Sequence, residues 1–105
     1  MDTLAMLPII KERLLANVAI AISEVILFGS RTKIKKSKAD YDLVVVTKTK
    51  CSWQDKELIL NELYDIEVEF DILTDLHIIS KDEITNSLRG AEPIFQNAFK
   101  KGIYA

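Results

Sequence analysis

The fold is decided by two stretches of the sequence, Val25-Ile26-Leu27-Phe28-Gly29-Ser30-Arg31 and Asp40-Tyr41-Asp42-Leu43-Val44-Val45-Val46. Each contains a short continuous apolar run, which is typical of a buried β-strand. The first strand is expected over residues 25–28, and the second over 40–47. A helix that starts at Gly29-Ser30 would point free backbone N–H groups at an anion. Asp40 and Asp42 share one side of their strand, about 6.6 Å apart along it, so together they can hold cations close to that anion.

Helices are predicted before and after these strands. Apolar residues repeat at helical spacing over about residues 4–18, and Pro8 suits the first turn of that helix. Residues 30–36 are predicted to form a short helix and residues 37–39 a loop. Because the chain has only three glycines and two prolines, its elements are expected to be tightly joined.

Two capping boxes predict further helix starts. Ser52 with Asp55 begins one helix, and Ser80 with Glu83 begins another, for which Gly90 is the expected C-cap. In a capping box, each side chain accepts a hydrogen bond from the backbone N–H of the other residue.

The remaining elements follow from alternation and from proline and glycine. The segment Glu67–Ile72 alternates strictly between acidic and apolar residues, which predicts a strand. Pro93 precedes a helix expected over about residues 94–100, which Gly102 ends, and residues 103–104 are expected to form an edge strand. This order of elements predicts a small α/β or α+β domain with helices packed on a short sheet.

Composition limits the class of protein. The chain has 105 residues, 49% of them hydrophobic, which fits a single domain over residues 1–105. No apolar run is long enough to cross a membrane, and the first residues do not resemble a secretory signal. A single cysteine favours a reducing, cytoplasmic setting. The net charge of −2 argues against general nucleic-acid affinity, so direct DNA binding is not expected.

A local basic segment contrasts with this acidic balance. Five cations and no acid lie between Arg31 and Lys38. Such a segment can attract a polyphosphate, an RNA strand or an acidic partner, or it can be a solvated loop that only aids solubility.

Three acids are the candidate metal ligands. Asp40 and Asp42 lie on the second strand, and Asp71 lies with two glutamates on one side of the strand predicted at 67–72. If the strands are neighbours, these carboxylates repel one another unless cations lie between them. Oxygen ligands favour Mg²⁺ or Mn²⁺, and two such ions can bridge an attacking hydroxyl and a nucleotide phosphate. One cysteine and one histidine provide no zinc set.

The turn after the first strand is the candidate nucleotide site. Gly29 lets the backbone approach phosphates that a Cβ would crowd. The Ser30 hydroxyl and nearby N–H groups can bind a phosphate, and Arg31 can neutralise the leaving pyrophosphate. Each feature also has a simpler account: a Gly-Ser pair is often only a turn, and an Asp-x-Asp pair is often a solvated strand end.

Four other residues receive simpler interpretations. His77 is expected to be a surface or cap residue, and Cys51 an unreactive thiol. Trp53 is interpreted as a core residue or an interface anchor. Tyr104 is either a packed edge residue or a partner contact.

The combined motif resembles a known family. Gly29-Ser30-Arg31, Asp40-Tyr41-Asp42-Leu43 and the later Asp71 are similar to the minimal nucleotidyltransferases, small members of the polymerase-β-like nucleotidyltransferase superfamily. Ile94-Phe95 and Gly102-Ile103-Tyr104 also resemble the family's usual ending, so the likeness covers nearly the whole chain. The chain departs from the family pattern at Lys33-Ile34, where an Arg-Gly pair is common.

The resemblance implies a compact mixed sheet flanked by helices and a reaction that uses ATP with Mg²⁺, two ions being expected. The reaction would transfer a nucleoside monophosphate, AMP, to a hydroxyl. Asp40, Asp42 and Asp71 match the family's catalytic, metal-binding acids, and Gly29 and Ser30 match its nucleotide-binding turn.

The resemblance also implies a partner. Such small proteins are often antitoxins that are paired with a toxic HEPN-domain ribonuclease. The better understood ones attach AMP units to a tyrosine of that toxin and thereby silence it. Two non-catalytic alternatives remain open: a module that neutralises a partner by contact alone, and a sensor that binds ATP and Mg²⁺ without turnover. Because the domain is too small to carry an evident acceptor-recognition module, a partner chain or self-association is expected to supply one.

Overall fold

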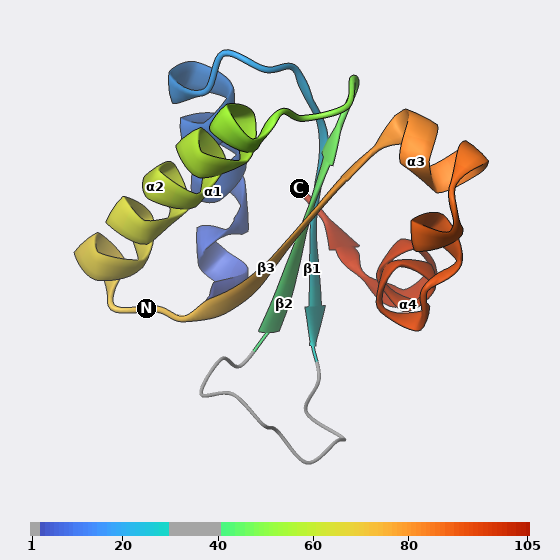
Figure 1. Ribbon diagram of the computed structural model, residues 1–105. Helices are drawn as coiled ribbons and strands as arrows, with labels where there is room; N and C mark the ends of the chain where they lie inside the picture. The colour runs from blue at the N-terminus through green and yellow to red at the C-terminus, as the bar shows by residue number, and fades with distance from the viewer. Residues whose placement is uncertain (1–2, 30–40) are drawn as a thin grey trace.

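The computed structural model describes residues 3–29 and 41–105 and places helices on both faces of one sheet (Figure 1). The helix and loop predicted over residues 30–36 and 37–39 lie outside the described residues. In chain order the elements are α1 (Thr3–Asn17), β1 (Ile22–Gly29), β2 (Tyr41–Thr47), α2 (Trp53–Phe70), β3 (Thr74–Ser80), α3 (Lys81–Asn86), the 3₁₀ helix η1 (Leu88–Ala91), α4 (Pro93–Lys101) and β4 (Ile103–Tyr104).

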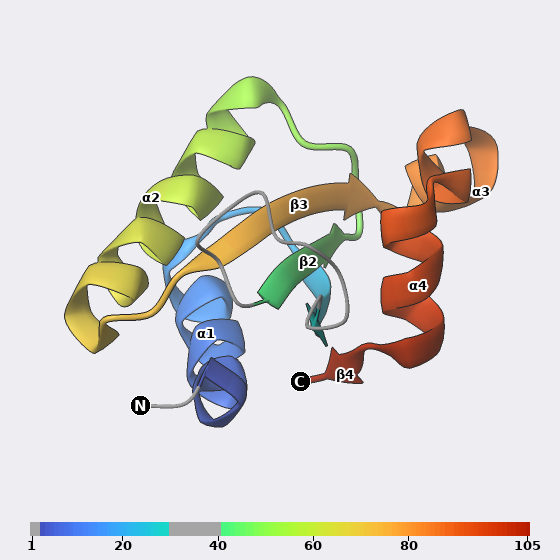
Figure 2. The same cartoon turned by 90° about the horizontal axis from the view of Figure 1, so that it is seen from below.

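The four strands form a mixed sheet in the order β3-β2-β1-β4. β1 is antiparallel to both β2 and β4, whereas β3 runs parallel to β2. Helices α1 and α2 cover one face, and α3 and α4 lie on the other (Figure 2). The expected fold class, an α/β domain with a small mixed sheet flanked by helices, is confirmed.

Both faces of the central strands are buried, which explains why their sequences are continuous apolar runs. Alternate residues of β2 contribute to different cores: Leu43 and Val45 pack towards α1 and α2, and Val44 and Val46 pack towards α4. The smaller core, on the α4 side, consists of six buried residues, Ile26, Val44, Val46, Ile79, Phe95 and Ala98.

The prediction of a strand over Glu67–Ile72 is wrong, because α2 continues through Phe70. The buried residues Ile59, Leu63 and Ile66 keep helical spacing, and no proline or glycine interrupts them. Val68, which the alternation placed on an apolar strand face, is 65% exposed. A six-residue window contained too little periodicity to distinguish an amphipathic strand from the end of a long helix.

Ion pairs between helices support the longer α2. Arg13 on α1 pairs with Glu62 at 3.1 Å and also with Glu69 on the last turn of α2. The third strand is instead β3, which begins four residues after α2 ends.

Side chains protect the outer edge of β3, which forms one edge of the described sheet. The backbone N–H of Thr74 donates to the Glu67 carboxylate at 2.8 Å. The backbone carbonyl of Ile78 accepts from the guanidinium of Arg89 at 2.9 Å. Blocking of this kind prevents a free strand edge from pairing with another chain.

The segment after the second capping box differs from its prediction. Helix α3 ends at Asn86, and Gly90 lies within η1 instead of capping α3. A Cβ on Gly90 would lie 2.3 Å from the backbone oxygen of Ile84, so close approach of two backbones requires glycine here. The predicted C-terminal helix, its Gly102 end and the short final strand are confirmed.

Candidate functional site

The end of β1 and the start of β2 lie side by side at the lower end of the sheet in Figure 1. Gly29 pairs with Tyr41, and Phe28 pairs with Asp42. The antiparallel register therefore brings the glycine of the predicted turn next to the acidic strand start. Ser30, Arg31 and Asp40 lie outside the described residues, as does the basic segment up to Lys38.

Asp42 has an acidic neighbour on β3. In the parallel register, Asp42 pairs with Asp75. Register partners on adjacent strands point to the same face, and adjacent strands lie about 4.8 Å apart. Both carboxylates therefore project from the face that carries α4, and Asp42 lies beside the end of β1.

His77 lies on the same face, two residues further along β3. Its Nε2 lies 3.1 Å from Oδ1 of Asp42, within hydrogen-bond distance. The side chain of Asp42 is 15% exposed, and that of His77 is 32% exposed. His77 is therefore a partly exposed strand residue with a side-chain partner, and not a helix cap.

Asp71 does not lie on a strand. It is the C-cap of α2, has left-handed backbone angles (φ 55°, ψ 52°), and donates its N–H to the carbonyl of Glu67. Its side chain is exposed, and it precedes the first residue of β3 by three positions. The prediction that Asp71 shares a strand face with two glutamates is wrong, since that segment is helical.

The donor set in the described part of the chain is small. Within residues 3–29 and 41–105, no group of three or more His, Cys, Asp or Glu side chains is arranged to hold a metal ion. Asp42 and Asp75 supply two carboxylates, and the other acid of the predicted pair is Asp40.

The comparison with protein-family models decides the family. Residues 10–100 match the model described as polymerase beta, nucleotidyltransferase. The chain belongs to this nucleotidyltransferase family. A search of curated proteins and a search of solved structures each returned no significant match.

Nucleotidyltransferases of this kind generally use nucleotide substrates and divalent metals. Among the described residues, Asp42 and Asp75 at paired positions of adjacent strands supply two of the hard oxygen donors that Mg²⁺ and Mn²⁺ prefer. Within the described residues, no helix is both long and apolar enough to span a membrane.

Sequence reasoning missed Asp75 and His77 in this nucleotidyltransferase domain. A signal for their strand was present: Leu76-His77-Ile78-Ile79 is apolar apart from one residue and ends at the Ser80 capping box. The strand was instead predicted over the preceding segment, because that segment alternates regularly between acidic and apolar residues. The parallel pairing with β2, which brings these residues to Asp42, is a tertiary feature.

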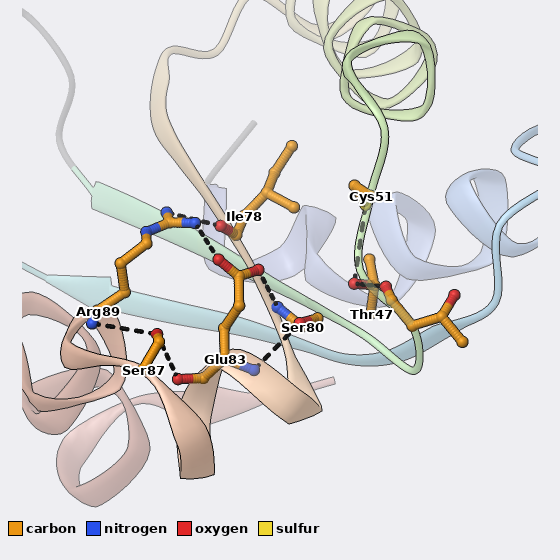
Figure 3. Close-up of polar contacts among 8 residues, drawn as sticks. Thr47, Cys51, Ile78, Ser80, Glu83, Ser87 and Arg89 are labelled. Carbon is orange, nitrogen blue, oxygen red and sulfur yellow. Dashed lines mark hydrogen bonds and ion pairs between the residues drawn. The ribbon is translucent and has the colours of Figure 1, made fainter.

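A polar cluster lies at the C-terminal end of β3 (Figure 3). The Glu83 carboxylate accepts from the Ser80 backbone N–H at 3.1 Å and from the Arg89 guanidinium at 2.9 Å. Arg89 also lies over the ring of Phe95, 5.5 Å from its centroid. The cluster thus connects the end of β3 to η1 and α4.

Glu83 makes stability depend on pH. Burial raises the pKa of its carboxyl, but the hydrogen bonds from Ser80 and Arg89 lower that pKa by more than burial raises it. The pKa of Glu83 therefore lies below its ordinary value. A group with a depressed folded-state pKa stabilises the fold above its unfolded pKa, and that contribution disappears as the pH falls through the folded-state pKa. We expect Glu83→Gln to be less stable than the wild type at pH 7, with the difference shrinking below about pH 4.3, the ordinary glutamate value.

Urea unfolding at pH 7 and at pH 3 measures this difference for the two proteins. A difference in the free energy of unfolding that stays constant between the two pH values would contradict the assignment.

The left-handed conformation of Asp71 gives a second prediction. Glycine adopts positive φ without the steric cost that a Cβ brings. Asp71→Gly is therefore expected to raise the free energy of unfolding by about 0.5–1 kcal/mol, despite the greater freedom of glycine in the unfolded chain. Thermal and urea unfolding of the two proteins measure the change, and a destabilised variant would show that the Asp71 carboxylate makes a contact worth more than the relieved strain.

Cys51 is a buried thiol outside the site. Its Sγ lies 3.7 Å from Oγ1 of Thr47, and burial raises the pKa of the thiol (Figure 3). A raised pKa reduces the thiolate fraction at neutral pH, which favours the interpretation of Cys51 as unreactive.

Proposed function

We propose that this domain transfers AMP from ATP to a hydroxyl group, with Mg²⁺ as the metal, and that the hydroxyl belongs to a partner protein. One observation carries the proposal: in a nucleotidyltransferase family domain, Asp42 and Asp75 occupy paired strand positions, and Asp42 lies beside the strand that ends at Gly29. Paired carboxylates beside a glycine-ended strand suit a nucleotide's phosphates and the cations that accompany them.

Asp42 and Asp75, with Asp40 before them, are the proposed metal-binding acids. In this proposal Asp75 has the metal-binding role that the sequence pattern assigned to Asp71, because Asp75 lies on the strand adjacent to β2. Gly29, Ser30 and Arg31 are the proposed nucleotide-binding turn. When bound, Mg²⁺ would neutralise phosphate charge and favour ionisation of the attacking hydroxyl.

The reaction balances as a simple displacement. The acceptor oxygen forms a bond to the α-phosphorus of ATP, and the bond from that phosphorus to the pyrophosphate oxygen breaks. Pyrophosphate leaves, and the proton of the hydroxyl passes to a base, a role that we assign to the carboxylate of Asp75. Arg31, in the predicted turn, is proposed to balance the charge of the leaving pyrophosphate.

The proposed partner is a HEPN-type toxin, which would make the domain an antitoxin. An exposed apolar stripe on α2 supports a protein partner: Trp53 is 70% exposed, and Leu60, Tyr64 and Val68 follow it with at least half of their surface free. Aromatic side chains are enriched at protein interfaces. The interpretation of Trp53 as a core residue is wrong, and its role as an interface anchor belongs to this proposal.

Labelled ATP tests the proposal directly. The protein is incubated with Mg²⁺, ATP labelled at the α-phosphate, and a HEPN-domain protein as the candidate partner. Label on the partner supports AMP transfer, and Asp42→Asn is expected to abolish it. Asp82→Asn is a matched control, because it removes an exposed carboxylate on α3, which accepts a hydrogen bond from the side-chain amide of Asn86 at 2.7 Å.

The same experiment distinguishes the transferase from an antitoxin that acts by contact alone. The exposed apolar stripe on α2 favours a protein partner in both cases. An antitoxin that acts by contact leaves the partner unlabelled, and Asp42→Asn then neutralises the partner as well as the wild type does. Binding of ATP with neither transfer nor neutralisation would support a nucleotide sensor.

A further inference from the structure

His77 lies between the acidic strand ends and the α4 side of the core. On β3, Asp75, His77 and Ile79 alternate onto the face that carries α4, since Ile79 belongs to the smaller core and Ile78 to the larger one. His77 pairs in register with Val44, one step along the same face from Asp42. Its ring therefore reaches diagonally to the Asp42 carboxylate, where Nε2 and Oδ1 lie 3.1 Å apart.

The hydrogen bond indicates which ring nitrogen carries a hydrogen. An ionised carboxylate only accepts hydrogen bonds, so the bonded nitrogen of His77 must carry the proton. His77 thus donates its Nε2–H to Oδ1 of Asp42.

Aromatic packing holds the imidazole in place. The ring of Phe95 meets it edge to face, with centroids 6.3 Å apart and an interplanar angle of 83°. Phe95 is 2% exposed, and its ring stacks with Phe99 at 6.4 Å. Arg89 packs over Phe95, and both Glu83 and the Ile78 carbonyl bind its guanidinium. The position of the donor is consequently determined by α4 and η1, and not by β3 alone.

A fixed donor matters because the last torsion of an aspartate is soft. Rotation about the bond to the carboxyl group has a broad minimum, so a carboxylate without a partner samples many orientations. A hydrogen bond to Oδ1 restricts that rotation and leaves Oδ2 as the oxygen available to another ligand. Groups that orient metal-binding side chains in this way commonly change metal affinity tenfold to a hundredfold when removed.

We propose that His77 is a positioning residue, which orients the Asp42 carboxylate for a divalent cation without itself touching the cation or the substrate. The inference rests on the proposed function, in which Asp42 is a metal-binding acid. The inference adds a residue that lies outside the Gly-Ser and aspartate motifs. It also makes the geometry of the metal site depend on the packing of α4.

Mn²⁺ binding, followed by electron paramagnetic resonance in the presence of a non-hydrolysable ATP analogue, tests the inference without relying on activity. His77→Phe is expected to raise the Mn²⁺ dissociation constant about tenfold, as for loss of an orienting group. His77→Gln, which keeps an amide N–H at a similar reach, is expected to restore most of the wild-type affinity. Leu88→Ala, at a residue that is 90% exposed, is the control for an unrelated substitution.

Several outcomes separate the possibilities. If the wild type binds no Mn²⁺, both the proposed function and the role of His77 are overturned. If the wild type binds Mn²⁺ and a folded His77→Phe binds it equally well, only the role of His77 is overturned. Thermal unfolding establishes that each variant is folded, and should His77→Phe unfold, the comparison of His77→Gln with His77→Ala decides instead.

The chain's single histidine allows a further check. With ¹⁵N-labelled histidine, direct ligation would appear as a Mn–¹⁵N coupling in pulsed electron paramagnetic resonance. A positioning residue gives no coupling of the strength expected for a bond, and observation of one would make His77 a ligand and overturn the inference.

Discussion

Asp42→Asn and Asp75→Asn are each expected to lower nucleotidyl transfer by about a hundredfold to a thousandfold, the loss typical of one charged or polar group in a preorganised site. Each substitution keeps the size of the side chain and removes the negative charge. Because the two residues are register partners on adjacent strands, losing either carboxylate halves the described acidic pair. The measurement is the rate of labelled AMP transfer at saturating ATP and Mg²⁺.

Asp71→Asn is the informative comparison. The sequence pattern placed the third acid at Asp71, whereas the structure places Asp71 at an exposed helix C-cap with positive φ. Asparagine is tolerated in this backbone conformation, so the substitution tests the charge and preserves the cap. We expect Asp71→Asn to leave transfer nearly unchanged.

The opposite result would reassign the site. If Asp71→Asn abolishes transfer and Asp75→Asn does not, the third acid lies at the end of α2 and the register argument for Asp75 is wrong. Asp82→Asn serves as the charge-matched control, and circular dichroism establishes that every variant remains folded.

The second large effect concerns stability. Phe95→Ala is expected to lower the free energy of unfolding by about 3–5 kcal/mol, the range for loss of a buried phenylalanine. Phe95 is 2% exposed and contacts the rings of His77 and Phe99 as well as the guanidinium of Arg89. The substitution therefore leaves a cavity in the smaller core and removes the support of two polar groups. For a domain of this size the melting temperature should fall by on the order of 15 °C.

Urea and thermal unfolding measure the effect of Phe95→Ala. Phe95→Leu, which fills most of the same space without a ring, is expected to cost less than the alanine substitution. Leu88→Ala provides the exposed control and should change the free energy of unfolding by no more than about 0.5 kcal/mol. A loss of similar size in Phe95→Ala and Leu88→Ala would mean that the α4 side of the sheet is not a packed core.

The predictions from sequence succeeded where local chemistry is unambiguous. The capping boxes at Ser52 and Ser80 begin helices as expected, and each has both of its reciprocal hydrogen bonds. The two apolar runs form strands, and the helix after Pro93 ends at Gly102. In each case a few neighbouring residues determine the backbone, because caps, proline and glycine act over one turn.

They failed where a pattern was short and two periodicities competed. The alternation at Glu67–Ile72 matched a strand, but the preceding helix continued through it, held by burial of Ile66 and by ion pairs to Arg13. Gly90 matched a C-cap, yet it is retained for the close approach of η1 to Ile84. The ion pairs to Arg13 join helices that are far apart along the chain, so no local window contains them.

By itself, the sequence determined the fold class and the family, since the order of apolar runs, caps and acidic strand starts is a local property of the chain. It also placed Asp42 beside the glycine that ends the first strand. Only the tertiary structure decided which residues join Asp42. The parallel pairing of β3 with β2 brings Asp75 and His77 to it, and the packing of α4 holds His77 there. The physical reason is that strand register depends on contacts between distant segments, and a change of strand assignment by a few residues replaces every side chain on the shared face.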